Sequence, residues 1–417
     1  MPFVMEPLSE SSDVIPSEIF ENLTSYLFYK YFPTEDAAQK FCHLVGMVPH
    51  PDLTNFIPPC PRCGGAMEKK EDSSEKFGYI YRCEKINQRE KKRRRTGGFI
   101  WRAKCTGAIS CAQNTFFEGA KLSAQKVLMI IYSWVKDEPV TLAARECGVA
   151  KHTAVDWYNF CREIAEVIVS NDQKQIGGEN LRVEVDETFT RRRKYNRGRI
   201  TKGTQLTIFG AYCRETREMM YWHVENKSRR VLWSHMSRYI APGSIIVSDS
   251  APQYRGCTTM GFSEHKTVNH SQQGPGRFVN SDDPEAHTQN IEGRHRWLKK
   301  SIKSLRTDRS LQSYTCTYVY RTRFLSQLPT ESAKYRQFIE HIVAVYPGPG
   351  REGLQLKTIG VPVDEDQPPD EPYFDVYLPD EEDPQGDDDP PTSDSTNTFV
   401  VDPKDQAEAG TSGLSEA

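Results

Sequence analysis

The stretch that decides the fold is "LRVEVDETFTRRRKYNRGR", residues 181–199. Apolar residues alternate with polar ones from Leu181 to Asp186, which predicts a half-buried strand. Asp186 and Glu187 stand side by side near its end, and a block of Arg and Lys follows within a few residues. We expect Glu187 to point to the opposite side of the strand from Asp186 and to be no ligand. A strand carboxylate beside dense positive charge needs an explanation.

Two further acids follow in segments with clear patterns. "PGSIIVSDS" predicts a short buried strand that ends at Asp249. "HTQNIEGRHRWLKKSIKSL" predicts a helix that carries Glu292 beside an apolar stripe of Ile291, Leu298, Ile302 and Leu305. The face that holds Glu292 also holds Arg296, Lys299 and Lys303. An acid on a cationic face usually forms only an intrahelical salt bridge.

The segments between these acids give the order of the domain. "GTQLTIFGAYCRETREMMYWHVE" predicts a β-hairpin, "SRRVLWSHMSRYI" a helix, and "HKTVNHS" a further short strand. Strand, hairpin, helix, strand and helix is the order of a ribonuclease-H-like α/β fold with a mixed sheet, in which three carboxylates meet. Three carboxylates at one point repel one another unless a divalent cation neutralises them, and oxygen ligands suit Mg²⁺ or Mn²⁺. Two such ions can clamp an in-line displacement at phosphorus, with the Arg and Lys blocks holding DNA.

A cysteine cluster precedes this domain. "PPCPRCGGAM" places Cys60 and Cys63 at the spacing of a zinc knuckle. Cys83 and Cys105 complete a favoured four-cysteine Zn²⁺ ribbon if the basic stretch 84–100 loops out between them. The alternative second pair is Cys105 with Cys111, and ordinary buried thiols are a third interpretation.

Two other segments suggest contact with nucleic acid. "REKKRRRT", residues 89–96, is a nuclear-import signal, a phosphate-binding loop or a solvated charged loop. "VTLAARECGVAKHTAVDWYNFCREI" predicts a helix-turn-helix that turns at Gly148, packs through Leu142, Ala143 and Val155, and presents Lys151, His152 and Thr153 to a major groove. A plain helical hairpin fits this pattern equally well.

Charge and cysteine usage support a polyanionic partner inside the cell. Residues 364–417 hold 18 acids and one base, Lys404, whereas residues 1–363 hold 53 bases and 39 acids, a formal charge of +14. A basic body suggests nucleic acid. The start of the chain lacks the pattern of a signal peptide, and the longest apolar run, "VLMIIY", is too short for a membrane span. We expect reduced thiols, no membrane and a nuclear location.

The whole chain is therefore predicted to be a multidomain α+β protein. The expected parts are N-terminal helices at 1–55, a zinc ribbon with a basic loop at 56–118, a helix-turn-helix at 119–172, a catalytic domain at 180–347 and a disordered acidic tail at 348–417. The cations expected to bind DNA are Arg191, Arg192, Arg193, Lys194, Arg197 and Arg199 beside the first acid, Lys151, and Arg296, Lys299 and Lys303 in the last helix.

From roughly Glu35 to Tyr346 the chain resembles the Merlin group of DDE transposases and their bacterial insertion-sequence relatives. The motifs that carry the resemblance are "VEVDETFTRRRKYNRGR", "PGSIIVSDSAPQY", "HKTVNHS" and "HTQNIE". It implies Asp186, Asp249 and Glu292 as the catalytic, metal-binding acids and gives Lys299 a phosphate contact. His295 stands where the family usually has Trp, the gap between Asp249 and Glu292 is long, and the ribbon carries an insertion.

The resemblance implies a cut-and-paste transposase that uses Mg²⁺ or Mn²⁺. It would bind the element's terminal inverted repeats and target DNA, as a dimer or larger assembly. The alternatives are a domesticated DNA-binding regulator with an idle nuclease domain, and a nuclease for branched or RNA-paired substrates. His270 and His287 flank the long loop, and we interpret them as turn or capping histidines rather than DNA contacts.

Overall fold

The computed structural model describes residues 16–53, 56–93, 97–189, 206–268, 285–302 and 308–357. At Pro16 and in residues 86–93, 97–104 and 308–310 it describes the backbone alone. All of the described residues belong to one compact unit.

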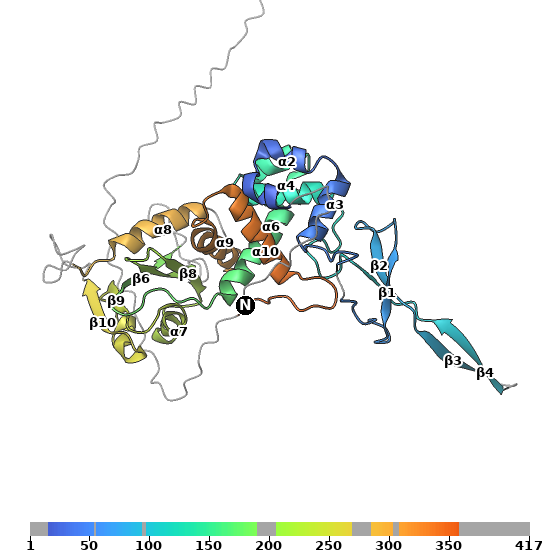
Figure 1. Cartoon of the computed structure of the whole chain (residues 1–417). Coiled ribbons are helices and arrows are strands. Elements are labelled where there is room, and N and C mark those ends of the chain that lie inside the picture. The colour runs from blue at the N-terminus through green and yellow to red at the C-terminus, as the bar shows by residue number, and fades with distance from the viewer. Residues whose placement is uncertain are drawn as a thin grey trace, which may run out of the picture. The chain divides into compact units, whose positions relative to one another are not determined.

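The described part of the chain begins and ends with helices (Figure 1). They are α1 (Pro16–Asn22), α2 (Ser25–Tyr31), α3 (Glu35–Leu44), α4 (Ala124–Val135), α5 (Val140–Glu146), α6 (Lys151–Asn171), α7 (Arg229–Tyr239), α8 (Gln289–Ser301), α9 (Asp308–Tyr320) and α10 (Glu331–Val345). A π-helical turn, Arg321–Leu325, follows α9. No helix among the described residues is long and apolar enough to cross a membrane.

The most apolar helix, α4, is the centre of a helical layer. Nearly all of its side chains are buried, and it packs against α3, α5, α6 and α10. The Ser123 hydroxyl caps its first turn by accepting from the amide of Lys126. At its last turn the Trp134 ring stacks on Phe338 of α10 with ring centroids 4.5 Å apart. The C-terminal helices therefore return to complete a core that begins near the N-terminus.

A five-stranded mixed sheet forms the second core. Its strands are β6 (Arg182–Phe189), β7 (Thr207–Cys213), β8 (Met219–Val224), β9 (Ile245–Asp249) and β10 (Glu264–Val268), in the order β10-β9-β6-β7-β8. β6, β7 and β8 pair antiparallel, whereas β9 runs parallel to both β6 and β10. The mixed α/β architecture fits a ribonuclease-H-like transposase domain.

Helices cover the two faces of the sheet. His235 of α7 contacts the rings of Phe209 and Trp222 on one face. His295 of α8 contacts Tyr221 on the other face, because successive residues of a strand point to opposite sides. Figure 1 shows α8 and α7 on either side of the strands.

The segment predicted as a helix-turn-helix forms two packed helices. Gly148 adopts the left-handed region with φ 56°, and this turn lets α6 follow α5 closely. Ala143 is buried and Leu142 is partly buried, while Lys151 at the start of α6 is exposed. This geometry is common to DNA-reading and purely structural helix pairs, so the DNA-binding role stays a prediction.

The cysteine-rich segment contains two small sheets. One consists of β1 (Met67–Glu71), β2 (Tyr79–Cys83) and β5 (Ala108–Ser110), in the order β1-β2-β5. The other is the hairpin of β3 (Ile86–Arg93) and β4 (Gly97–Lys104). The sequence predicts that the basic stretch 84–100 loops out between Cys83 and Cys105, and in the structure it does so as a paired hairpin. A hydrogen bond from the amide of Cys105 to the carbonyl of Lys85 closes the base of this hairpin. The sequence gives no clear sign of this pairing, because β3 is almost entirely polar and shows no apolar alternation.

The predicted start of the acidic tail also needs correction. The structure ties residues 348–357 to the helical layer, although the sequence assigns them to the tail. Asn114 donates to the carbonyls of Gly348 and Arg351, and the amide of Lys357 donates to the Ser170 hydroxyl. Backbone hydrogen bonding orders this segment despite its few apolar residues. Residues 358–417 lie outside the described residues.

The Trp134 ring gives a direct test of the helical layer. Trp134→Ala should lower the free energy of unfolding by about 3–5 kcal/mol, because the ring is 1% exposed and its removal leaves a cavity. Trp297→Ala is the matched control: that indole is 58% exposed, so its loss should cost less than about 1 kcal/mol. Urea unfolding followed by circular dichroism measures both, and equal losses would contradict the packing described.

Candidate active site and candidate metal centre

Two of the three predicted acids lie level on neighbouring strands. β6 and β9 pair parallel, with Glu184 opposite Val247. Two residues further along each strand, this register brings Asp186 beside Asp249, on the same face of the sheet. Asp186 also lies opposite Gly210 of β7, whose missing side chain makes room for the Tyr221 ring and for His295.

The third acid lies on the helix that covers this face. Glu292 is in the first turn of α8, which packs against β6 and β7, and its carboxylate accepts from the Thr288 hydroxyl at 2.9 Å. One turn later, the Nδ1 of buried His295 lies 3.5 Å from the Asp186 carboxylate. A Cβ at Gly210 would lie 3.1 Å from the Nε2 of His295, so glycine permits this close approach of helix and strand.

The electrostatics of Asp186 reflect this convergence. Burial, followed by the negative charges of Glu187, Asp249 and Glu292, holds the pKa of the Asp186 carboxyl well above its usual range. Burial and the charge of Lys299 lower the pKa of His295 to about 3, so the ring is neutral at pH 7. A neutral imidazole adds no positive charge beside the Asp186 carboxylate. Such a site favours a cation.

Glu184 is a residue that sequence reasoning left without a role. The alternating pattern puts it on the polar face of β6, yet it is fully buried because α8 covers that face. Arg214 donates to its carboxylate at 2.6 Å, and the Asn290 side chain and the amide of Ile291 donate at 2.7 and 2.8 Å. Glu184 therefore fixes the start of α8 directly to β6.

Arg214 extends this attachment to the segment before α8. Its guanidinium also donates to the backbone carbonyls of Glu285 and His287. The His287 imidazole lies 3.7 Å from the Glu184 carboxylate, so this histidine belongs to the attachment of the helix. His270 lies outside the described residues.

Glu187 faces away from the three acids, as the strand period requires. It pairs with Phe209, next to Gly210 on β7, and its side chain is 4% exposed. Tyr254 donates to its carboxylate, and Lys227 lies 3.5 Å away. These contacts satisfy a buried charge on the opposite face.

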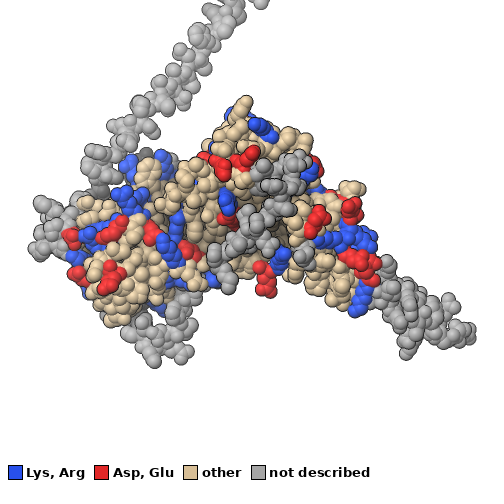
Figure 2. Space-filling model, in the orientation of Figure 1, with Lys and Arg blue, Asp and Glu red and all other residues tan. Residues whose placement is uncertain are grey.

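The structure describes only some of the Arg and Lys residues that are expected to bind DNA. Arg191, Arg192, Arg193, Lys194, Arg197, Arg199 and Lys303 lie outside the described residues. Arg296 is exposed and Lys299 half-buried on α8, whereas Lys151 lies in α6. In Figure 2, basic and acidic side chains alternate over the surface around α8.

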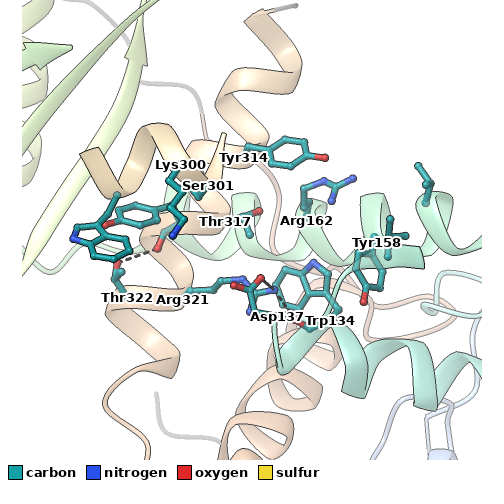
Figure 3. Close-up of a pocket in the computed structure, with 14 residues that line it drawn as sticks. Trp134, Asp137, Tyr158, Arg162, Lys300, Ser301, Tyr314, Thr317, Arg321 and Thr322 are labelled. Atoms are coloured by element: carbon teal, nitrogen blue, oxygen red, sulfur yellow. Dashed lines mark hydrogen bonds and ion pairs between the residues drawn. The ribbon is translucent and has the colours of Figure 1, made fainter. Parts of the chain in front are cut away.

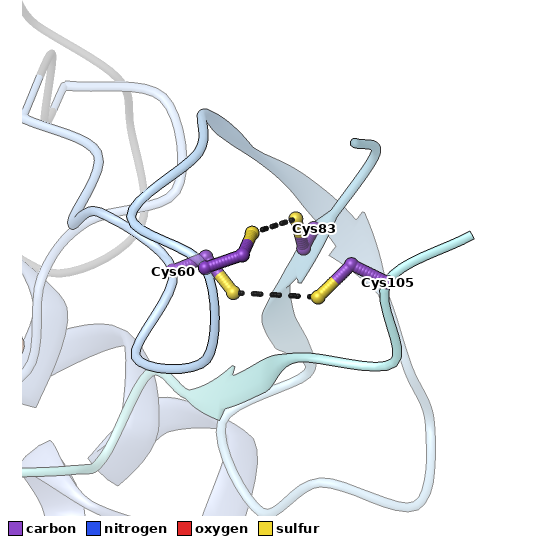
Figure 4. A group of neighbouring side chains, drawn as sticks. Cys60, Cys83 and Cys105 are labelled. Atoms are coloured by element: carbon purple, nitrogen blue, oxygen red, sulfur yellow. Dashed lines mark hydrogen bonds between the residues drawn. The ribbon is translucent and has the colours of Figure 1, made fainter. Parts of the chain in front are cut away.

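Four cysteines form the second candidate site. The sulfur atoms of Cys60, Cys63, Cys83 and Cys105 all lie within 4.8 Å of one another. Figure 4 shows thiols from the knuckle facing Cys83 and Cys105. Among the described residues, the three acids do not form so tight a group. Four thiolates at tetrahedral spacing fit Zn²⁺, so this cluster could bind zinc.

The turn geometry of the ribbon supports this arrangement. Gly64 adopts φ 64°, and its amide donates to the carbonyl of Cys60 to close the knuckle. A Cβ at Gly107 would lie 2.3 Å from the Cys60 sulfur, so only glycine fits there. Cys111 is fully buried and lies outside the cluster, and burial raises the pKa of its thiol to about 12.

A comparison with known families gives a match over the sheet domain. Residues 168–324 match the family model described as the ISXO2-like transposase domain. This match supports a DDE transposase domain. It includes all three acids and excludes the cysteine cluster, and it covers less than half of the 417 residues.

Other comparisons add little to the transposase match. Among solved structures, one similar chain is from the cryo-EM structure of the simian T-cell lymphotropic virus intasome in complex with the PP2A regulatory subunit B56 gamma. It is 14% identical, covers 48% of this chain and 70% of that chain, and has a TM-score of 0.24. That overlap is too low to support an argument. No curated protein matches the chain.

The cysteine cluster predicts a specific metal content. Purified protein should hold about one Zn²⁺ per chain, and Cys83→Ser should lose it because three thiolates leave one corner open. Cys111→Ser is the matched control and should keep the metal, since Cys111 lies outside the cluster. Elemental analysis after gel filtration measures both. Loss of zinc from Cys111→Ser alone would instead favour the Cys105–Cys111 pairing.

The attachment of α8 predicts an unequal response of two Arg–Glu pairs. Glu184→Ala should lower the free energy of unfolding by about 3–5 kcal/mol, because it leaves the 11%-exposed Arg214 without a carboxylate. In the control pair, Arg182 and Glu215 are 29% and 28% exposed, so Glu215→Ala should cost about 1 kcal/mol or less. Equal losses in chemical unfolding would show that Glu184 does not fix the helix.

Proposed function

We propose that the chain is a Merlin-type DNA transposase that moves its element by cut-and-paste strand cleavage and transfer. The observation that carries the proposal is the level placement of Asp186 and Asp249 on neighbouring strands, beneath the helix that bears Glu292. Burial, together with the neighbouring carboxylates, raises the pKa of Asp186 and supports the same conclusion. The transposase match over residues 168–324 agrees with it.

Asp186, Asp249 and Glu292 would hold Mg²⁺ or Mn²⁺, because their donors are all carboxylate oxygens. Two such ions, when bound, activate the attacking water or 3′-hydroxyl and stabilise the leaving oxygen. The chain's own residues position these acids. Glu184 and Arg214 fix α8 and hence Glu292, and Gly210 lets neutral His295 approach Asp186.

The remaining parts would bind DNA. Arg296 and Lys299 follow Glu292 on α8, where they could contact backbone phosphates. The zinc ribbon, the basic residues 191–199 and the α5–α6 pair with Lys151 would bind the terminal inverted repeats. Because two element ends react together, we propose a dimer or larger assembly that also binds target DNA. The basic run 89–96 would direct the protein to the nucleus.

The test is a cleavage assay with the full chain and a duplex that ends in the terminal repeats flanking its element. With Mg²⁺ or Mn²⁺, wild type should cut at the repeat end and join the 3′-hydroxyl to target DNA. Asp186→Asn, Asp249→Asn and Glu292→Gln should each reduce cleavage at least about 100-fold, because each removes a charged ligand of the metals. Binding to the repeats should persist.

Glu215→Gln is the control, since this carboxylate belongs to the exposed pair with Arg182 and should not affect cleavage. Specific binding without cleavage by wild type under either metal would favour the domesticated DNA-binding regulator. Cleavage of branched or RNA-paired substrates in preference to the repeats would favour the other nuclease class. Either result would overturn the proposal.

A further inference from the structure

A cavity of about 610 Å³ lies outside the three-acid site. Its walls come from α4, α6, α8 and α9, and Figure 3 shows side chains of these helices converging on it. The residues that matter here are Tyr158, Arg162, Trp297, Lys300 and Tyr314. The volume is within the range of about 300–1,000 Å³ typical of small-molecule sites. Since α8 contributes to both places, the cavity and Glu292 share one rigid element.

Arg162 is a buried cation without a matching anion. The residue is 8% exposed, and its guanidinium lies 4.4 Å from the centre of the Tyr314 ring. Among the described residues, no carboxylate forms an ion pair with it; the Asn159 side chain accepts its hydrogen bond. An unpaired guanidinium in such a place is costly unless an anion enters.

The second arginine of the cavity is already satisfied. Arg321 forms an ion pair with Asp137 at 3.4 Å, donates to two carbonyls at the end of α4, and stacks on Trp134. The lining therefore has three cations, Arg162, Lys300 and Arg321, against the single carboxylate of Asp137. With Asp137 paired to Arg321, the positive charges of Arg162 and Lys300 are available to an anionic ligand.

An aromatic surface stands beside these cations. The Trp297 indole on α8 is 58% exposed, and the Lys300 ammonium lies 5.1 Å from its centre. Tyr158 and Tyr314 line the inner wall. Aromatic faces next to cations that no described carboxylate pairs with suit a ligand with a flat ring and a negative charge. A nucleotide has both, since its base stacks and its phosphate accepts from Arg or Lys.

We propose that this cavity binds one unpaired nucleotide of a DNA strand, with its base against Trp297 and its phosphate toward Arg162 and Lys300. The proposal rests on the proposed transposase function, which supplies the DNA. Trp297 follows Glu292 by five residues, or roughly 7.5 Å along the helix axis. Five residues also turn the helix by about 140°, so the cavity lies on a different side of α8 from Glu292, a little over one turn further along.

The test compares the affinity of the full chain for three fluorescent duplexes by anisotropy. One is blunt, one carries a single unpaired thymidine with a terminal phosphate, and one carries the same thymidine without it. Wild type should bind the phosphorylated overhang about tenfold more tightly than the blunt duplex, the scale of one stacked base. Trp297→Ala should remove this preference and leave affinity for the blunt duplex unchanged. Trp297→Phe should keep most of it.

Arg162→Gln should abolish the contribution of the terminal phosphate, and Arg162→Lys should retain part of it. Tyr26→Ala is the matched aromatic control, because Tyr26 is 90% exposed on α2, away from the cavity lining. Thermal unfolding of each variant checks that it is folded. If Arg162→Gln does not fold, the overhang preferences of Arg162→Lys, Trp297→Ala and Trp297→Phe still test the nucleotide site. An equal overhang preference in wild type and Trp297→Ala would overturn the proposal.

Two further arms separate the explanations. Free thymidine monophosphate that competes as well as the overhang at equal concentration would assign a free-nucleotide site and overturn the DNA-borne one. Cleavage of repeat DNA without a Trp297-dependent preference would overturn the nucleotide site alone. A preserved preference with no cleavage would overturn the transposase proposal and leave the nucleotide site standing.

Discussion

The buried ion pair of Glu184 and Arg214 is the contact on which the candidate active site depends. A carboxylate with no exposed surface is stable there only because a guanidinium, an amide side chain and a backbone amide all donate to it. Two of those donors belong to the first turn of α8. The helix therefore begins at a fixed point above β6. Glu292 directly follows Ile291, so the same hydrogen bonds fix its place over the strand.

The strand register and the helix start act together. The parallel pairing of β6 with β9 brings two acids level, and the attachment of α8 brings the third above them. The absent side chain of Gly210 removes the steric barrier between strand and helix. The polar contacts that satisfy the buried Glu184 carboxylate thus also hold the three acids close together. A bound cation would offset the repulsion between these acids. A purely apolar contact could fix the distance of the helix but not its rotation.

The sequence predicts the elements that have strong periodicity. The alternation before Asp186, the short apolar run before Asp249 and the helical spacing around Glu292 all correspond to observed elements, and so do the hairpin and α7. Glu184 could not be assigned from the same alternation, because burial of its face depends on α8, which is distant in sequence. The β3–β4 hairpin could not be predicted, because the many charged residues of β3 mask any strand pattern. The structure of residues 348–357 depends on hydrogen bonds to Asn114 and Ser170, which are distant in sequence.

The basic hairpin is a place where residues can be inserted or deleted without disturbing the zinc ribbon. It leaves the ribbon after Lys85 and returns at Cys105, and one backbone hydrogen bond closes its base. Within it the two strands pair only with each other. Residues can therefore be added or lost in cross-strand pairs without moving any of the four thiols. A longer or shorter arm would therefore leave the geometry of the four cysteines unchanged.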